Sequence, residues 1–405
     1  MNLPDFIAKR TINTENGQFS GSIYKIAISS IAIGLAIMLC AVLILGGFKN
    51  TISDKIYSFG GHLQVTKYTL NNSFEESPIS INTNFYTNYK EYDYLDHVQS
   101  FAYKAGLLKA LEAVEGVIIK GVGEDYDTAN FSKNIIEGRF PDLLKEGYSS
   151  EVLVSRKLAT LLQINIGDEV LMYFVQNPPR YRQINVVGIY QTGLEEFDER
   201  IIIGDIALIQ RLNNWKEDEV GGYEIFLKDG VDHDIAEAAI FNEVESDQFV
   251  NKTKDKYSQY FEWLTLLNQN VKLFLSLILF VACFNMVAVI FILIMERTNM
   301  IGILKACGAN NQLIRKIFFF SGIRLTLKGL LYGNTIALGF SVLQYYFKLI
   351  PLDVDNYYMP FVPIAWDFEA ILIINLLVLV LVGFTLILPT ILITRLKPIA
   401  AIRFD

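Results

Sequence analysis

The chain has 405 residues, of which 52% are hydrophobic and 19% are charged, a balance that indicates both membrane-embedded and aqueous parts. Residues 49 to 269 contain no cysteine, which excludes disulfide stabilisation of that segment. They hold 21 Lys and Arg against 35 Asp and Glu, and a net charge of −14 disfavours binding to the phosphates of nucleic acids.

Four uncharged stretches are long and apolar enough to cross a membrane, which takes about 20 residues of helix. They are residues 26 to 48, 273 to 295, 329 to 347 and 370 to 394. The alternative is that they form buried helices of a large soluble protein. Helices that are apolar on every side over this length are rare in soluble domains, so we favour the membrane.

The third of these stretches is the least apolar, because it contains Asn334 and Gln344. Arg324 and Lys328 precede it, and their long side chains can reach water at a membrane boundary. We therefore expect this crossing helix to begin near Ile317.

The distribution of charge predicts the orientation in the membrane. Outside residues 49 to 269 the chain carries 14 basic and 8 acidic residues, and short basic segments stay on the cytoplasmic side. The cations that flank the predicted crossings are Lys9, Arg10, Lys25, Arg297, Lys305, Arg315, Lys316, Arg395, Lys397 and Arg403. Both termini are therefore expected inside. No cleavable signal peptide is expected, because the first crossing starts late and lacks a small-x-small cleavage site.

These observations predict a membrane α-helical fold with four transmembrane helices and a large extracytoplasmic α+β domain inserted between helices 1 and 2. The expected order is a cytoplasmic segment (1–22), transmembrane helix 1 (23–48), the external domain (49–269), transmembrane helix 2 (270–295), a cytoplasmic segment (296–316), transmembrane helix 3 (317–347), a short external link (348–369), transmembrane helix 4 (370–394) and the cytoplasmic C-terminus (395–405).

The external domain mixes strand and helix patterns. β-branched and aromatic residues with partial alternation predict strands at 62–68, 117–122, 169–175, 183–190 and 223–229. Helical spacing predicts helices at 155–164, 204–212 and 234–244. Asp234 is the expected N-cap of the last helix, and residues 69 to 97 are expected to form a long loop or an irregular insertion.

Little in this domain indicates catalysis. His62, His97 and His233 are too far apart in sequence to suggest a metal motif, and no nucleophile elbow or HExxH motif occurs. The acidic run from 193 to 200 lacks the spacing of a calcium loop, so a solvated loop is favoured. Residues 176 to 183, "QNPPRYRQ", fit a stiff hairpin tip. The pattern leaves open whether this tip is an ordinary loop or contacts a protein.

The sequence also lacks a phosphate-binding loop of the G-x-x-x-x-G-K-[ST] type, so this chain is not expected to hydrolyse ATP. Between the second and third crossings, Met300 to Cys307 fit two helical turns that Gly308 can end. Asn310 or Asn311 can then cap the next helix. Two interpretations stay open: the segment is a short helix that lies in a groove of a partner protein, or it is a loop whose basic residues only mark the cytoplasmic side.

This stretch, "ERTNMIGILKACGANNQLIRK", resembles the segment between the second and third crossings of FtsX/MacB-type ABC transporter permeases. The ending "RLKPIAAIRFD" is similar to the C-terminus of that family, with Ile402 where Leu is common. The segments "FIAKR" and "LVSRKLATLLQINIGDEV" resemble the lipoprotein-releasing branch of LolC/LolE permeases. One crossing, a large external domain and three further crossings are also the layout of that family.

The resemblance implies that the short cytoplasmic helix is a coupling helix, which a dimeric ATPase receives in a groove. The residues that correspond to this role are Glu296, Arg297, Met300, Ile303, Leu304, Lys305, Gly308 and Ala309. The chain itself would be a non-catalytic subunit without a cofactor or metal, and the partner ATPase would bind ATP and Mg.

The branch further implies release of lipoproteins from the bacterial inner membrane by two permeases, either two copies of this chain or this chain and a sister subunit. The implied apolar cavity would be lined by Ile33, Ile37, Leu39, Phe280, Phe284 and Val287. A hook-like loop that recruits a periplasmic chaperone would correspond to Pro178, Pro179, Arg180 and Arg182, although the loop is short for a hook. Two alternatives are a permease that relays ATPase strokes to periplasmic partners without extracting lipid, and a membrane receptor that needs no ATPase.

Overall fold

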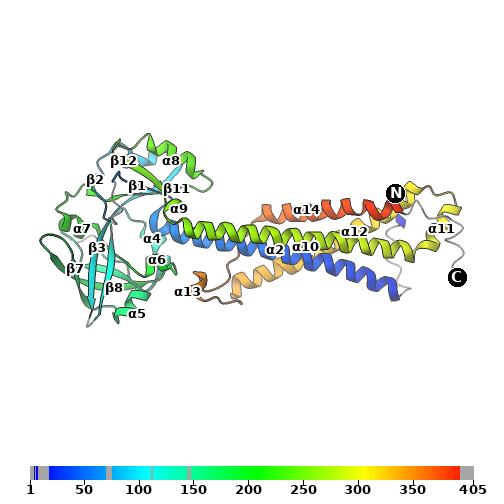
Figure 1. The fold of residues 1–405 in the computed structure, drawn as a ribbon, viewed down its shortest axis with the longest axis horizontal. Coiled ribbons are helices and arrows are strands. Elements are labelled where there is room, and N and C mark those ends of the chain that lie inside the picture. Colours follow the sequence, from blue (N-terminus) through cyan, green and yellow to red (C-terminus); the bar gives the residue numbers. More distant parts are fainter. Residues whose placement is uncertain are drawn as a thin grey trace. The chain divides into compact units, whose positions relative to one another are not determined.

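A computed structural model describes residues 4, 6–7, 18–69, 75–110, 113–143 and 147–392 of the protein (Figure 1). The chain divides into two compact units. The helical unit comprises residues 1–50, 263–351 and 361–405, and the sheet unit comprises residues 51–262 and 352–360. The basic residues expected near both ends, including Lys9 and Arg395, lie outside the described residues, as do most of the terminal segments that carry the family resemblance.

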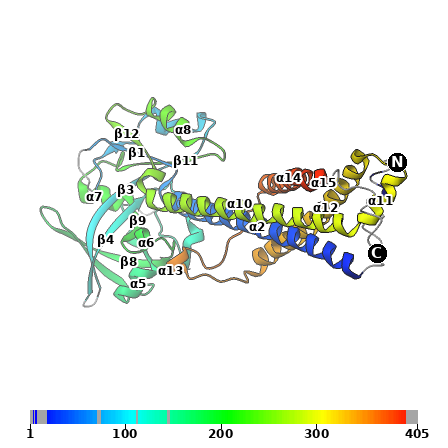
Figure 2. The same cartoon turned by 45° about the vertical axis from the view of Figure 1, so that its right-hand side comes forward.

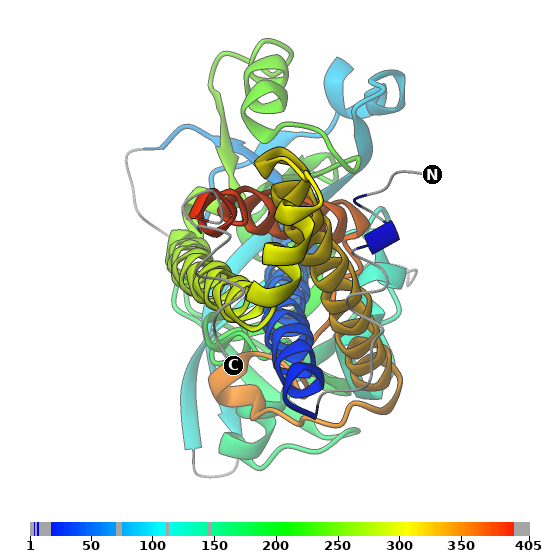
Figure 3. The same ribbon diagram turned by 90° about the vertical axis from the view of Figure 1, so that its right-hand side faces the viewer.

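The helical unit is built from long helices that lie side by side (Figure 3). The helices that lie in it wholly or in part are α2 (Gln18–Gly60), α10 (Ser258–Glu296), α11 (Thr298–Ala306), α12 (Asn311–Phe347), α14 (Phe368–Thr385) and α15 (Ile387–Leu392). Their common core is apolar and includes Leu35, Leu39, Ile290, Leu293 and Leu325. On α2 and on α10 the positions named here lie four and three residues apart, so each of these two helices presents one stripe to the core.

Three helices of the described chain are long and apolar enough to cross a membrane: Tyr24–Gly60, Ser258–Glu296 and Phe368–Pro389. Helix α12 has 37 residues but is less apolar, as the sequence indicated. The crossing by α12, and hence the total of four, therefore stays a prediction.

Close helix contacts explain two glycines of α12. A Cβ atom at Gly329 would lie 2.7 Å from Cβ of Ile31, and one at Gly333 would lie 2.8 Å from the carbonyl oxygen of Ala32. Gly329 and Gly333 are four residues apart and therefore share one face of α12, which is the small-xxx-small pattern of membrane helix pairs. Helices α2 and α12 thus approach each other as closely as their backbones allow.

Two pairs of polar side chains link neighbouring helices of the helical unit. The side-chain amides of Asn334 and Asn375 exchange hydrogen bonds of 2.7 and 3.0 Å between α12 and α14. Asn285 Nδ2 donates to Ser30 Oγ at 2.8 Å between α10 and α2. Satisfied polar groups of this kind are compatible with a low-dielectric surrounding, so Asn334 does not exclude α12 from the membrane.

The sheet unit contains a ten-stranded sheet (Figure 2). Its strands are β1 (Leu63–Lys67), β3 (Leu95–Ala110), β4 (Ala113–Val122), β5 (Ile135–Gly138), β6 (Glu151–Ser155), β7 (Glu169–Phe174), β8 (Arg180–Tyr190), β9 (Ile201–Asp205), β11 (Gly222–Leu227) and β12 (Gln248–Lys252). The strand order is β12-β1-β11-β3-β4-β9-β6-β8-β5, and β7 pairs with both β3 and β8. The pairings β3–β4–β9–β6–β8–β7–β3 close a ring, which removes exposed edges there.

Shorter elements complete the sheet unit. They are β2 (Ile79–Ser80), β10 (Glu219–Val220), α3 (Asn84–Thr87), η1 (Tyr89–Glu91), α4 (Thr128–Phe131), η2 (Ser132–Asn134), α5 (Arg156–Leu162), α6 (Glu195–Asp198), α7 (Ile206–Asn213), α8 (His233–Phe241), α9 (Thr253–Lys256) and α13 (Val354–Tyr357). All five predicted strands and all three predicted helices are confirmed. The expected N-cap of α8 is wrong, because the side chain of Asp232, and not that of Asp234, accepts from the first backbone amides.

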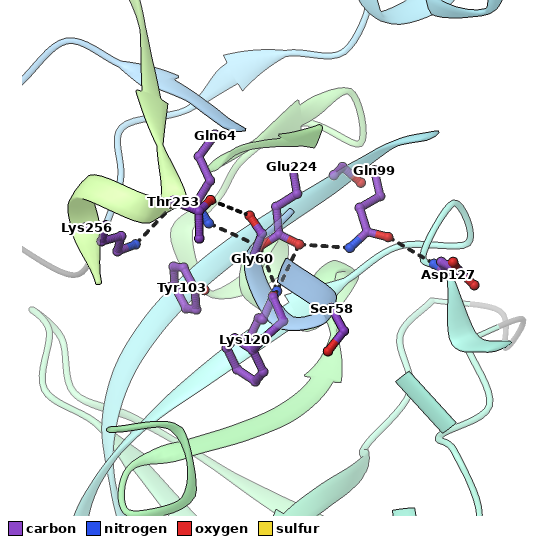
Figure 4. Close-up of polar contacts among 12 residues, drawn as sticks. Ser58, Gly60, Gln64, Gln99, Tyr103, Lys120, Asp127, Glu224, Thr253 and Lys256 are labelled. Atoms are coloured by element: carbon purple, nitrogen blue, oxygen red, sulfur yellow. Dashed lines mark hydrogen bonds and ion pairs between the residues drawn. The ribbon is translucent and has the colours of Figure 1, made fainter. Parts of the chain in front are cut away.

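A buried polar network lies inside this unit at the end of α2 (Figure 4). Lys120 of β4 and Glu224 of β11 form an ion pair with Nζ–Oε distances of 2.7 and 2.9 Å, and neither side chain is exposed. Lys120 also donates to the carbonyl oxygen of Phe59, near the end of α2. Gln99 donates to Glu224 at 2.8 Å, so the carboxylate has a second donor. The network fixes the last turn of α2 to the centre of the sheet.

Candidate functional site

The short helix α11 lies within two residues of the two helical turns that the sequence predicts from Met300 to Cys307. Helix α10 ends at Glu296, and α11 runs from Thr298 to Ala306. Gly308 has a φ of +88°, which favours glycine, and its amide donates to the carbonyl oxygen of Lys305 at 3.0 Å. Asn310 Oδ1 accepts from the amide of Leu313 at 2.8 Å and caps α12. A compact turn therefore joins α11 to α12.

One face of α11 is held by the helix core. Ile301 is fully buried, Gly302 is buried, and Met300 packs against the same core. Leu304 and Lys305 are half-buried, and Ala309 packs against the core as well. Two of the predicted coupling residues, Met300 and Ala309, therefore contribute to the attachment of α11.

The opposite face of α11 is exposed. Its exposed residues are Asn299, Ile303, Ala306 and Cys307: Ile303 follows Asn299 by four residues, and Ala306 and Cys307 follow Ile303 by three and four. Ile303 is the large apolar side chain among them and is 60% exposed. Of the predicted coupling residues, Glu296 and Gly308 are also exposed, and Arg297 is half-buried. Sequence reasoning missed Asn299, Ala306 and Cys307, although their helical spacing from Ile303 is a usable signal.

The predicted cavity residues divide between surface and core. Ile33 and Ile37 of α2 are 56% and 50% exposed, and Phe280 and Phe284 of α10 are 68% and 67% exposed. Val287 is half-buried. The side chain of Leu39 is fully buried in the core of the helical unit, so within this chain it reaches no surface that could line a cavity.

Helix α10 carries a longer apolar stripe than the sequence reasoning singled out. Leu273, Leu277, Phe280 and Phe284 are all exposed and follow one another at intervals of four, three and four residues. This spacing places them on one face of α10. A continuous apolar face of this kind can contact acyl chains or another apolar helix.

The segment 176–183 forms the predicted hairpin tip. Strands β7 and β8 pair from Glu169 opposite Asn185 to Phe174 opposite Arg180, and Pro178 and Pro179 at the tip are exposed.

The two arginines of the segment are less available than its prolines. Arg180 donates to the carbonyl oxygens of Arg211 and Leu212, both at 3.0 Å, and thereby holds the hairpin against the end of α7. Arg182 is half-buried and donates to the carbonyl oxygen of Tyr181 at 2.8 Å. Tyr181 and Val175 are 65% and 79% exposed, so the surface near the tip is mainly apolar.

The acidic run from 193 to 200 is not the solvated loop that the sequence predicts. Residues Glu195–Asp198 form α6, in which Phe197 and Asp198 are buried. Lys157 Nζ pairs with Glu195 and Glu199 at 2.9 and 2.7 Å. Within the described ranges, no group of three His, Cys, Asp or Glu side chains is placed to hold a metal ion.

Known families match both parts of the chain. The family described as MacB-like periplasmic core domain matches residues 26–242, and the family described as FtsX-like permease C-terminal matches residues 272–398. The transmembrane protein LolC of the lipoprotein-releasing system of Neisseria meningitidis is 23% identical over 96% of this chain and 95% of its own length. The corresponding LolE of Haemophilus influenzae is 20% identical over 84% of this chain and 82% of its own length.

Among solved structures, the periplasmic region of MacB from Actinobacillus actinomycetemcomitans matches 51% of this chain and 95% of that region, with a TM-score of 0.35 and 15% identity. The family matches to residues 26–242 and 272–398 together span most of the sequence, and the first alone spans more than half. The protein therefore belongs to the FtsX/MacB family of ABC transporter permeases.

Proposed function

We propose that the protein is the transmembrane subunit of an ABC machine that releases lipoproteins from the inner membrane, driven by ATP hydrolysis in a partner ATPase dimer. The exposed face of α11 is the observation that carries this proposal. A two-turn helix that is anchored by Ile301 and presents Ile303 can place one apolar side chain in a groove of another protein. Its turn into α12, closed by Gly308 and Asn310, gives a displacement of α11 a direct path to the long helices.

The lipoprotein substrate is supported by the printed names of the relatives and by the apolar stripe of α10. Acyl chains need no polar partner, and Leu273, Leu277, Phe280 and Phe284 offer none. Moving an acyl chain out of a bilayer costs about 0.8 kcal/mol per methylene, so fifteen methylenes cost roughly 12 kcal/mol. An apolar shelter and an external energy source are both needed to meet that cost.

The proposed topology has four crossings, with both termini in the cytoplasm and the sheet unit in the periplasm. For α12, the paired amides of Asn334 and Asn375 support a membrane position. Tyr345 and Trp366 lie with ring centroids 6.2 Å apart near the end of α12, and such aromatic residues favour the membrane–water boundary. A second permease subunit would complete the assembly. The apolar hairpin tip with Pro178 and Pro179 would contact a periplasmic chaperone.

The test compares two Ile→Asp variants with similarly exposed side chains. Ile303→Asp places a charge on the exposed face of α11, and Ile235→Asp places one on exposed α8 of the sheet unit. We expect Ile303→Asp to abolish co-purification of the ATPase and ATP-dependent release of a triacylated lipoprotein from proteoliposomes. Ile235→Asp should retain both.

The other outcomes would each contradict part of this proposal. ATPase coupling without any release by the unaltered protein would favour the permease that relays ATPase strokes to periplasmic partners. Absence of any ATPase from the purified protein would favour the receptor. Full activity of Ile303→Asp would contradict the assignment of α11 as the coupling helix.

A further inference from the structure

The segment that joins α12 to α14 contains a closed loop that belongs to the sheet unit. Residues 352–360, which we call the strap, group with residues 51–262. The amide of Leu352 donates to the carbonyl oxygen of Pro360 at 2.9 Å, which closes the loop at its base. Within it, α13 spans Val354–Tyr357, and Met359 is only 2% exposed. The strap is therefore an ordered loop with a buried side chain.

Three contacts hold the strap on the sheet unit. Lys55 Nζ donates to the carbonyl oxygen of Tyr358 at 2.6 Å and also to the carbonyl oxygen of Thr192. The rings of Tyr260 and Tyr358 meet edge to face, with centroids 5.7 Å apart. A Cβ atom on Gly193 would lie only 2.9 Å from the carbonyl oxygen of Tyr358. The strap thus lies directly against the backbone at Gly193.

The surface that receives the strap is built by a buried carboxylate. Asp198 is 6% exposed and accepts from the amide of Thr192 at 3.0 Å, from its hydroxyl at 2.7 Å and from the amide of Gly193 at 2.8 Å. These bonds fix the turn at residues 192–193. The carbonyl oxygen of Thr192 therefore faces Lys55 even before the strap docks. A preformed receiving surface lowers the entropic cost of docking.

We propose that the strap stays clamped to the sheet unit during the working cycle, so that displacements of α12 and α14 are passed to the sheet unit through Lys55, Gly193 and Tyr260. Without the strap, the chain passes between the two units only at residues 50/51 and 262/263; the strap adds connections at 351/352 and 360/361. A free connecting loop would transmit no displacement, whereas a loop fixed by hydrogen bonds and ring packing does. The proposal rests on the proposed function in one respect, namely that a partner ATPase moves the helices.

Lys55→Met tests the clamp, because methionine keeps an unbranched apolar side chain about as long as the lysine stem and removes the donor. Lys157→Met is the matched control, since Lys157 is an exposed lysine of the same unit whose partners are Glu195 and Glu199. In the full-length protein with its ATPase, we expect Lys55→Met to speed hydrogen exchange of the strap amides at least tenfold, and Lys157→Met to leave them unchanged.

Transmission is measured without any lipoprotein. In the unaltered protein, ATP should change hydrogen exchange of residues 192–198, and Lys55→Met should abolish that change while ATP hydrolysis continues.

Four results separate this proposal from the proposed function. Unchanged strap exchange in Lys55→Met would overturn the clamp. An unaltered response of residues 192–198 to ATP in that variant would overturn transmission, as would a missing response in the unaltered protein. Failure to release lipoproteins, with these exchange results as expected, would contradict only the proposed substrate and leave the strap supported.

Discussion

Breaking the buried ion pair between Lys120 and Glu224 should destabilise the sheet unit far more than breaking an exposed one. In Lys120→Met, Glu224 keeps the donors from Gln99 and Gln64 but loses its counter-charge in a site with no exposure. Burial lowers the pKa of Lys120 and Glu224 opposes that effect, so the charged lysine depends on its partner.

Removing one member of a fully buried pair costs roughly 3–5 kcal/mol, because the other charge stays buried without compensation. The same change at Lys67, whose partner Asp247 is 3.2 Å away and about half-exposed, should cost at most about 1 kcal/mol. Since about 1.4 kcal/mol corresponds to a factor of ten in an equilibrium constant, Lys120→Met should speed exchange of the most protected β4 and β11 amides by roughly two to three and a half orders of magnitude.

Hydrogen exchange of the full-length protein in nanodiscs measures this effect directly. Lys67→Met is the control, with an expected change of no more than about fivefold. The double variant Lys120→Met/Glu224→Gln should recover much of the loss, because no charge is then buried. If Lys120→Met changes exchange no more than Lys67→Met does, the ion pair does not stabilise the sheet unit and the reasoning is refuted.

Two further predictions concern one residue of the sheet unit and one pair in the helical unit. Burial lowers the pKa of His62 to about 4, and its Nδ1 accepts from the amide of Leu227 at 3.0 Å, so the neutral ring stabilises the fold above pH 6.5. That stability is lost as the pH falls from 6.5 towards 4. His62→Asn should therefore flatten the dependence of the melting temperature on pH over this range. An unchanged slope would contradict the role of His62 in this pH dependence. Asn334→Leu should cost about 0.6–1.7 kcal/mol in mixed-micelle unfolding, because the side-chain amide of Asn375 loses its partner on α12. Asn334→Leu/Asn375→Leu should be less destabilised than the sum of the two single variants, and simple additivity would argue against the pair.

Local patterns in the sequence predicted those elements whose cause is local. The turn between α11 and α12 is an example, because a positive φ at Gly308 and a cap at Asn310 depend only on neighbouring residues. Strands such as β8 were likewise visible from their own alternation. Strand β3 was missed, because buried polar residues such as Gln99 and Lys104 interrupt its apolar pattern.

Features that depend on distant parts of the chain were not predictable in the same way. Lys120 and Glu224 meet because β3 lies between β4 and β11, a strand order that neither residue indicates. Leu39 was named as a candidate cavity residue because every side of that helix is apolar, and only packing against its neighbours shows which side is buried. The exposed face of α11 has the same origin, since burial of Ile301 determines which side remains for Ile303.

The glycines at 329 and 333 constrain where the helical unit can open. At these positions no side chain of α12 separates its backbone from Ile31 and Ala32 of α2. The two helices are therefore too close for an acyl chain to pass between them there. In the proposed release of lipoproteins, lateral access for an acyl chain would therefore have to form between other helices. A displacement that reaches Asn310, at the start of α12, would therefore move α2 together with α12.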